Sequence, residues 1–380
     1  MNYYILPKNN FKISLFLSVN NKNVDPFISF SLIYHLNDIY TNLLKLEDNS
    51  TTNTGTNITI DYINQMVNPF EFIHTTVPGS LLSVSKMKPE SNIFFELMEI
   101  IQICNLTEMI SNNNKINIGH FTPNNTSTSY LINIFRNNED DLIIKEDFHF
   151  DNLLHMFLSS FNTNINPNTN INPNTNLNKR NLNILFFEFK DSDYIDPKKY
   201  TNNMILVLFI IINNQANNGT SIIKLDGMFY KIIIDIVFII TAIYDKVFLI
   251  KPTISNITKG ERYLVCKGYN NSYFAKEQIN ELLCNYFLRK EQNIHSLINN
   301  EIPYYFLNKI EECNSIIGQQ QLEAYDQIIN ILKNKNKEDK IESLKKNHIQ
   351  KCIQWCEKNQ IPHNKFTDKV NIFLVSKKDE

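Results

Sequence analysis

The sequence lacks any excess of charge of one sign. Its 37 Lys and Arg residues nearly balance its 39 Asp and Glu residues, which leaves a formal net charge of -2 at pH 7. A chain with so little net charge has no bulk attraction to nucleic acid, so such binding would have to come from a local basic patch. Composition therefore neither indicates nor excludes a nucleic-acid partner.

The chain also has few cysteines, and their spacing is unlike that of a metal site. Six cysteines are scattered over 380 residues without paired ligand spacing. The start, MNYYILPKNNFKIS, has no basic flank followed by an apolar segment of the secretory kind. Cys352 and Cys356 lie four residues apart on a predicted helix, where two reduced thiols are favoured over a metal site. We expect a reducing, cytoplasmic setting and no bound metal.

Long apolar runs are absent as well. The two longest, Met204 to Ile212 and Ile236 to Tyr244, are well short of the ~20 residues that a membrane-spanning helix needs. With 43% hydrophobic residues, the chain has enough apolar material for a full core. The two runs therefore predict buried core, and no membrane partner is expected.

What the sequence does contain is a regular alternation of short and long apolar segments. Residues 182 to 189, 221 to 227 and 246 to 252 predict strands, whereas residues 198 to 215 and 228 to 245 have the length of helices. Strands that alternate with helices indicate a parallel sheet wound by crossover connections. The predicted fold class is therefore α/β with a doubly wound, Rossmann-like sheet.

The same pattern extends upstream of an Asn-rich tract. Residues 161 to 181 repeat Asn-Thr-Asn-Ile-Asn-Pro and have almost nothing to bury, so they predict a disordered surface loop. Before them, residues 115 to 120 and 141 to 148 predict strands, and residues 90 to 106 predict a helix. A further helix is expected to begin near Ser127.

The two ends of the chain differ from its middle. Residues 1 to 70 show no clear pattern, whereas the carboxyl end predicts amphipathic helices over residues 273 to 289, 321 to 333 and 339 to 359. The predicted organisation is an N-terminal extension (1 to 74), a sheet domain (75 to 272) and a helical C-terminal region (273 to 380).

Polar residues stand at the predicted strand ends, where doubly wound sheets bind ligands. Glu188 ends one strand, Lys224 lies inside the next, and Glu261 opens the last. Each alone is more often a strand-end charge, but together they predict a site. The segment SIIKLDG places the Lys224 ammonium among apolar neighbours, and a buried lysine must be paired or have its pKa lowered. A lysine brought towards neutrality accepts a hydroxyl proton, and a carboxylate such as Glu261 holds it in place.

Two upstream connections complete the predicted site. Gly119, with Pro123, Asn124 and Asn125, follows the first strand. Asp147 ends the second strand, where it is placed to meet a ribose hydroxyl of a nucleoside cofactor.

The carboxyl half of this pattern resembles a known family. The order of IIKLDG, a helix, FLIKP, a loop with Ser and Thr, and GERYLVCKGY resembles FtsJ-like ribose 2'-O-methyltransferases, in which a strand lysine is followed by Lys-Pro, a Ser-rich loop and Glu-x-Tyr. The resemblance implies that Lys251 and Pro252 end the sixth strand and that Glu261 enters an antiparallel seventh strand as the catalytic glutamate. It also implies S-adenosylmethionine as cofactor and RNA as partner, with capped mRNA as a candidate.

The amino half resembles the family less closely. The segment INIGHFTPNNTSTSYLI is similar to the family's Gly-x-x-Pro-Gly-Gly loop, which implies cofactor contacts for Gly119, Pro123, Asn124 and Asn125. Asn117 stands where an acidic residue is usual, and the loop is one residue longer. Asn124 and Asn125 replace Gly-Gly, although Asn tolerates left-handed conformations better than most residues.

The family's catalytic set, Lys-Asp-Lys-Glu, is only half present. Glu188 keeps the acidic charge on a longer arm, with Asp191 as an alternative. The first lysine is replaced by a residue of opposite charge, unless Lys86 or Lys88 substitutes for it in space. The residues at the four positions are Glu96, Glu188, Lys224 and Glu261.

Two functions therefore stay open. The first is an S-adenosylmethionine-dependent RNA 2'-O-methyltransferase with Lys224 as base. The second is a methyltransferase fold without turnover that serves as an RNA-binding or scaffold subunit, which the changes at Glu96, Asn124 and Asn125 favour. The segment VPGSLLSVSKMKPESNIFFELMEI, together with this domain, is also similar to FtsJ-domain proteins of large cytoplasmic DNA viruses of the African swine fever virus kind. That similarity implies host cytoplasm or virion.

Overall fold

The computed structural model describes most of the chain. The predicted helix over 273–289 lies mostly outside the described residues, and so does the predicted Asn-rich loop over 161–181, apart from Asn181. The described residues are 2–10, 13–20, 24–50, 60–111, 115–136, 141–153, 181–270, 279–282, 286, 293–333 and 337–366.

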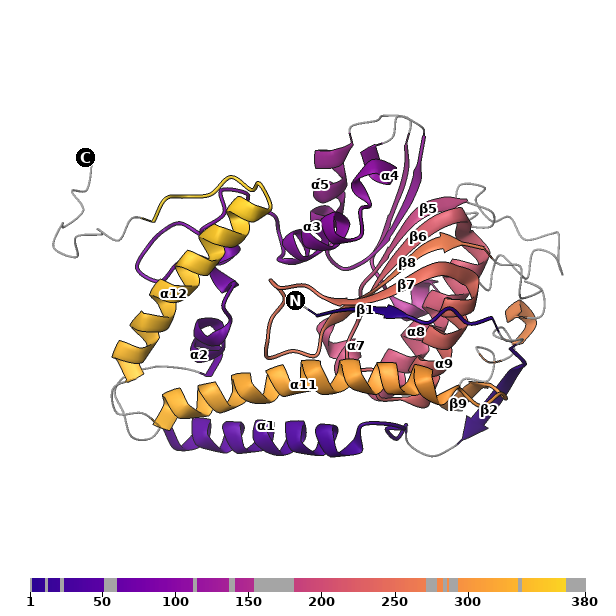
Figure 1. Cartoon of the computed structure of the whole chain (residues 1–380), viewed down its shortest axis with the longest axis horizontal. Helices are drawn as coiled ribbons and strands as arrows, with labels where there is room; N and C mark the ends of the chain where they lie inside the picture. The colour runs from indigo at the N-terminus through magenta and orange to yellow at the C-terminus, as the bar shows by residue number, and fades with distance from the viewer. Residues whose placement is uncertain are drawn as a thin grey trace.

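The helices and strands follow one another along the chain as drawn in Figure 1. The strands are β1 (Asn2–Leu6), β2 (Leu15–Asn20), β3 (Asn117–Phe121), β4 (Leu142–Glu146), β5 (Leu182–Phe187), β6 (Gln215–Leu225), β7 (Tyr244–Lys251), β8 (Arg262–Tyr269) and β9 (Asn293–Ile298). The helices are α1 (Phe30–Ser50), α2 (Ile60–Val67), the 3-10 helix η1 (Glu71–Ile73), α3 (Ile93–Ile103), α4 (Thr107–Ser111), α5 (Asn125–Phe135), α7 (Asp191–Ile195), α8 (Pro197–Asn214), α9 (Lys231–Ile243), α11 (Tyr304–Lys333) and α12 (Lys337–Lys358).

Seven strands form the central sheet in the order β1-β7-β8-β6-β5-β3-β4. Pairs among β3, β4, β5 and β6 are parallel, whereas β8 is antiparallel to both β6 and β7. The predicted α/β class, with a mostly parallel sheet and a reversed last strand, is therefore confirmed. The edge strand β1, which pairs antiparallel with β7, was not predicted.

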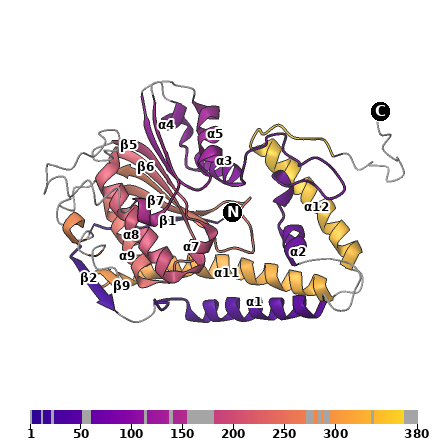
Figure 2. The same cartoon turned by 180° about the vertical axis from the view of Figure 1, so that it is seen from behind.

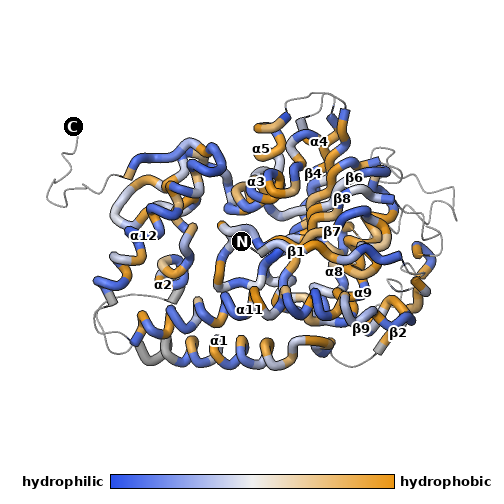
Figure 3. The backbone as a smooth tube through the Cα atoms, in the orientation of Figure 1, coloured by the Kyte–Doolittle hydropathy of each residue, from blue (hydrophilic) through white to orange (hydrophobic). Residues whose placement is uncertain are grey.

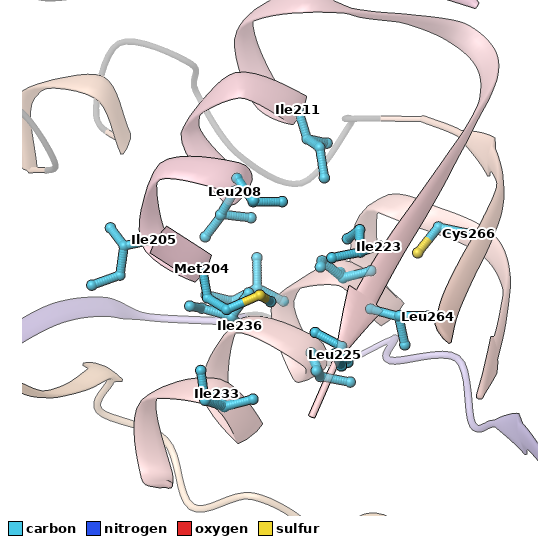
Figure 4. Packing of buried hydrophobic residues seen from close by; sticks show 14 of the residues in the cluster. Met204, Ile205, Leu208, Ile211, Ile223, Leu225, Ile233, Ile236, Leu264 and Cys266 are labelled. Carbon is cyan, nitrogen blue, oxygen red and sulfur yellow. The ribbon is translucent and has the colours of Figure 1, made fainter. Parts of the chain in front are cut away.

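Helices cover both faces of the sheet (Figure 2). On one face, α8 and α9 pack against strand residues such as Ile223, Leu225 and Leu264, and Figure 4 shows Met204 and Ile236 from these helices close to that strand surface. On the other face, α3 and α5 cover a second apolar cluster. The sheet is thus the middle layer of three, and only its edges are available for a site.

The start of α8 shows how local sequence sets one of these helices. Asp196 is the N-cap residue, and its Oδ1 accepts hydrogen bonds from the backbone N–H groups of Lys198 at 2.9 Å and Lys199 at 3.3 Å. Pro197 follows at the first helical position, where its missing N–H is not needed. The helix then runs through a buried apolar stretch to Asn214.

Two long helices lie in the predicted helical C-terminal region, which also contains the strand β9 (Asn293–Ile298), a strand that the sequence did not predict. The long helix α11 begins at Tyr304 instead of residue 321, and α12 covers the predicted range of 339 to 359 almost completely. In Figure 1, α11 runs alongside α1 and leads towards α12 and α2. A Cβ atom added to Gly318 would lie 2.5 Å from Leu32 Cδ1, so glycine permits the close approach of α1 and α11.

The hydropathy pattern agrees with this layered packing. In Figure 3 the central strands are mainly hydrophobic, whereas α1 and α11 mix both kinds of residue. No described helix is long and apolar enough to cross a membrane. The described cysteines, including Cys352 and Cys356 in α12, are buried and free, and the described residues contain no group of three or more His, Cys, Asp or Glu suited to a metal ion.

Candidate active site

The candidate site lies at the carboxyl edge of the sheet, where the winding direction reverses. Strand β3 has β4 on one side and β5 on the other, so the gap between β3 and β5 is the topological switch point. Open α/β sheets bind ligands in this crevice. Asn124, Glu188 and Lys224 follow or end β3, β5 and β6, and Glu261 precedes the antiparallel β8 at the same edge. These four residues line one cavity of ≈ 250 Å³.

Lys224 lies between two carboxylates. The residue is 7% exposed, and its Nζ atom lies 3.1 Å from Glu188 Oε1 and 3.6 Å from Glu261 Oε1. Burial alone would lower the pKa of Lys224, but Glu261, Tyr263 and Glu188 outweigh burial and hold this pKa well above its ordinary value. Of the two outcomes expected for a buried lysine, the structure has pairing. In the free site, Lys224 is therefore an ammonium and not a neutral amine.

A second lysine extends this network towards solvent. Lys259 Nζ lies 3.4 Å from Glu261 Oε1 and 3.0 Å from Asp191 Oδ2. Burial raises the pKa of Glu261, but Lys224 and Lys259 outweigh burial, so this carboxyl group has a pKa below its usual value. Glu261 is thus a carboxylate held between two ammonium groups. Sequence reasoning did not identify Lys259, because it lies in a polar loop without a strand-end position.

Glu96 lines the same cavity, and its surroundings disfavour its charged form. It is 4% exposed; one of its carboxyl oxygens accepts a hydrogen bond from the Tyr263 hydroxyl, and the other accepts one from Asn92 Nδ2 at 3.2 Å. Burial raises the pKa of Glu96, and Lys224 only partly offsets the effect. The neighbouring carboxylates Glu261 and Glu188 raise this pKa further, whereas the hydrogen bond from Tyr263 lowers it.

The loop between β7 and β8 is fixed by a buried lysine. Lys251 Nζ donates to the backbone carbonyls of Asn256 at 3.1 Å, Lys259 at 2.9 Å and Glu261 at 3.1 Å. Burial lowers the pKa of Lys251 to about 8. Three carbonyl contacts to one ammonium hold the backbone from which Lys259 and Glu261 project.

A buried carboxylate connects the same loop to the C-terminal helix α12. Glu99 of α3 accepts hydrogen bonds from Thr253 Oγ1 at 2.7 Å and from the Thr253 N–H at 3.0 and 3.1 Å. Trp355 Nε1 of α12 donates to Glu99 at 3.4 Å. The C-terminal region therefore contributes to the position of the loop that carries Glu261.

The cavity wall includes residues from the predicted N-terminal extension, residues 1 to 74. Asn68, Glu71 and His74 line it together with Ser91. Asn68 Oδ1 and Ser91 Oγ are buried and have no hydrogen-bond partner among the described residues. Unpaired buried polar atoms are costly unless a water molecule or a ligand satisfies them, so both atoms would gain from a hydrogen-bond donor beside the cavity wall.

The expected cofactor loop lies beside the cavity in part. Asn124 Nδ2 donates to Glu188 Oε2 at 3.0 Å, and Asn125 Nδ2 donates to Asp147 Oδ1 at 3.4 Å. Asp147, which follows β4, is exposed. The lining residues of the cavity include Asn124 but not Pro123, Asn125 or Asp147.

The backbone of this loop does not need glycine at its two Asn positions. Asn124 has φ -109°, and Asn125 is the first residue of α5, so neither adopts the left-handed conformation considered for them. Gly119 lies inside β3, where an added Cβ would be 2.8 Å from Leu185 Cδ2. The described contacts of Gly119 thus give it a packing role in the sheet.

The lysines considered as substitutes for the missing cation lie elsewhere. Lys88 Nζ donates to Ser83 Oγ at 2.7 Å, and neither Lys86 nor Lys88 lines the cavity. Asp191, the alternative to Glu188, does line it, but its described ion pair is with Lys259 and not with Lys224. Glu188 is the carboxylate in direct contact with Lys224.

The fold is an α/β sheet with a cavity, the candidate ligand site, at its switch point. Comparison with known proteins adds a sequence similarity. No family model matches the sequence. Over 158 residues the chain is 26% identical to the cap-specific mRNA (nucleoside-2'-O-)-methyltransferase 2 of Pongo abelii, a match covering 40% of this chain and 20% of that protein. The chain therefore spans about a fifth of the length of this curated relative.

Among solved structures, the chain matches a ribosomal RNA methyltransferase of Plasmodium falciparum. The match has a TM-score of 0.32 and 14% identity, and it covers 47% of this chain and 97% of that chain.

Proposed function

We propose that the protein is an RNA ribose 2'-O-methyltransferase that uses S-adenosylmethionine. The observation that carries the proposal is the cavity at the switch point, where Lys224 lies between Glu188 and Glu261. The sequence similarity to a cap-specific mRNA 2'-O-methyltransferase supports the same reaction class. Capped mRNA is therefore the first substrate to test.

The residues beside the cavity fit a cationic cofactor with hydroxyl groups. S-adenosylmethionine supplies an electrophilic methyl group on a positively charged sulfur. The carboxylates of Glu188 and Glu261 favour a positive charge in the cavity. Asp147, which directly follows β4, would meet a ribose hydroxyl of the cofactor. The loop with Pro123, Asn124 and Asn125 would border this cofactor, with Gly119 supporting its strand.

Lys224 has two successive tasks under this proposal. As an ammonium it donates a hydrogen bond to the ribose hydroxyl oxygen and orients it. To act as base it must first lose its proton, and any positive charge brought into the cavity lowers its pKa in that direction. Glu188 and Glu261 keep the side chain in place through their contacts at 3.1 and 3.6 Å. Activity should therefore rise with pH until the lysine has lost its proton.

The second candidate function is a methyltransferase fold that binds RNA without turnover. Two points favour it: Lys224 is held in its charged form by its neighbours, and the cavity residue Glu96 is acidic where the resemblance implies the family's first lysine. Such a subunit would bind RNA at the same edge of the sheet but would transfer no methyl group.

Calorimetry with S-adenosylmethionine separates these functions most simply. The methyltransferase proposal predicts saturable binding of the cofactor that weakens in Asp147→Ala. The control is Lys246→Ala, which changes an exposed residue near the amino end of β7, away from the cavity. Absence of cofactor binding by the wild-type protein would leave only the RNA-binding function. The cytoplasmic and viral settings implied by the resemblance stay predictions.

A further inference from the structure

The charges at the cavity mouth are unfavourable for a polyanion. Among the described lining residues, Lys224 and Lys259 are the lysines, and they face several carboxyl groups. The Lys224 side chain is only 9% exposed, whereas that of Lys259 is 47% exposed. A phosphate group that approaches from solvent therefore meets Lys259 first. The acidic residues of the lining are Glu71, Glu96, Glu188, Asp191 and Glu261.

The two ion pairs of Lys259 differ in strength. The inner partner, Glu261, has a side chain that is 14% exposed, and its carboxylate is also paired with Lys224. The outer partner, Asp191, has a side chain that is 73% exposed. An exposed ion pair contributes little because water screens both charges. The outer contact is therefore the one that another anion replaces most easily.

The backbone presents this ammonium from a fixed position. Lys251 Nζ donates to the backbone carbonyl of Lys259 at 2.9 Å and to that of Glu261 at 3.1 Å. Asp191 is the first residue of the short helix α7, and its side chain can turn to solvent without breaking a buried contact. Exchange of the outer anion thus leaves the inner pair with Glu261 in place.

We propose that Lys259 binds a phosphate of the RNA strand at the mouth of the cavity, and that Asp191 is a built-in competitor which this phosphate displaces. The inference rests on the proposed RNA function. Under it, Lys259 is the group that holds the sugar-phosphate backbone of the RNA next to Lys224. The phosphate takes the place of Asp191 beside the ammonium, and the displaced Asp191 carboxylate is exposed to water.

Binding of single-stranded RNA, capped and uncapped, measured by fluorescence anisotropy at several salt concentrations tests the role of Lys259. Lys259→Ala should weaken binding about tenfold and reduce the slope of log K against log salt by about 0.7. Lys259→Arg should retain most of the affinity. Lys246→Ala removes the same charge from an exposed lysine near the amino end of β7 and should bind like the wild type.

A double-mutant cycle tests the competition. Asp191→Asn should tighten RNA binding up to about fivefold in the wild-type background and have no effect in the Lys259→Ala background. Asp193→Asn, a change in the same helix at a residue that does not line the cavity, should have no effect.

The outcomes separate this inference from the function on which it rests. Equal tightening by Asp191→Asn in both backgrounds would show a general charge effect and overturn the competition. Wild-type affinity and salt slope in Lys259→Ala would overturn the phosphate contact while RNA binding stands. A wild-type protein that binds neither RNA would instead overturn the RNA function itself. If Lys259→Ala folds poorly, tightening by Asp191→Asn but not by Asp193→Asn in the wild-type background still tests the competition.

Discussion

Replacement of Lys224 by methionine tests whether its buried ammonium compensates the carboxylates around it. Methionine keeps an unbranched side chain but removes the charge. Loss of one partner of a buried ion pair costs about 3 to 5 kcal/mol. The low end applies here, because each carboxylate retains one other partner. Glu261 still pairs with the Lys259 ammonium at 3.4 Å, and Glu188 still accepts a hydrogen bond from the Asn124 side-chain amide at 3.0 Å. We therefore expect the free energy of unfolding at pH 7 to fall by about 3 kcal/mol.

The pH dependence of this loss has a definite sign. In the wild type the pKa of Glu261 is below its usual value, so its stabilisation is present at neutral pH and is lost as the pH falls through the folded-state pKa. Without Lys224, the pKa of Glu261 rises, and the carboxyl group takes up a proton at a higher pH. The difference between the two proteins should therefore shrink from pH 7 to pH 4.5.

Urea unfolding at these two pH values measures the effect, with Lys246→Met as the exposed control. A loss at pH 7 below about 1 kcal/mol, the size of an exposed ion pair, would refute the reasoning. So would a loss of the same size at both pH values, because the carboxylates would then not depend on Lys224.

Two further predictions concern other buried titratable groups. Burial raises the pKa of Glu96 and so disfavours its charged form. The neutral replacement Glu96→Gln should therefore change the free energy of unfolding by less than about 1 kcal/mol. Glu96→Ala should leave much of any methyl-transfer activity, and a loss of activity equal to that of Lys224→Ala would give Glu96 a role of its own. Burial lowers the pKa of His120 to about 3. In the unfolded chain this histidine takes up a proton below about pH 6.5, whereas in the folded protein it stays neutral. The wild type should therefore lose about 2 kcal/mol of stability between pH 7 and pH 4.5 from this residue. His120→Leu should show a shallower pH dependence in the same unfolding experiment, and an unchanged one would contradict the assignment.

The strands from β3 to β8 were predictable, because they are short apolar segments and most of them alternate with segments of helix length. The edge strand β1 was not, although Tyr4 and Leu6 are buried while Tyr3 and Ile5 are exposed. A five-residue alternation is too short to identify a strand, and its partner β7 lies more than 230 residues further along the chain. Nothing in local sequence specifies such a pairing.

The site shows the same division. Glu188, Lys224 and Glu261 were predictable as strand-end residues, and the structure brings them together. Lys259 and Asn68 were not, because one lies in a polar loop and the other in the segment before the sheet domain. Their positions depend on tertiary contacts, such as the three carbonyls held by Lys251, which no pattern of neighbouring residues reveals.

Transfer of a labelled methyl group from S-adenosylmethionine to capped and uncapped RNA tests the central claim most directly. The account predicts transfer by the wild-type protein that rises with pH, and a fall of about 10²- to 10⁴-fold in Lys224→Ala, compared with an unchanged rate in Lys246→Ala. Alkaline digestion of the product should leave a dinucleotide resistant to cleavage at the methylated ribose, because a 2'-O-methyl group removes the attacking hydroxyl. A wild-type protein that binds both cofactor and RNA yet transfers no methyl group at any pH would contradict it.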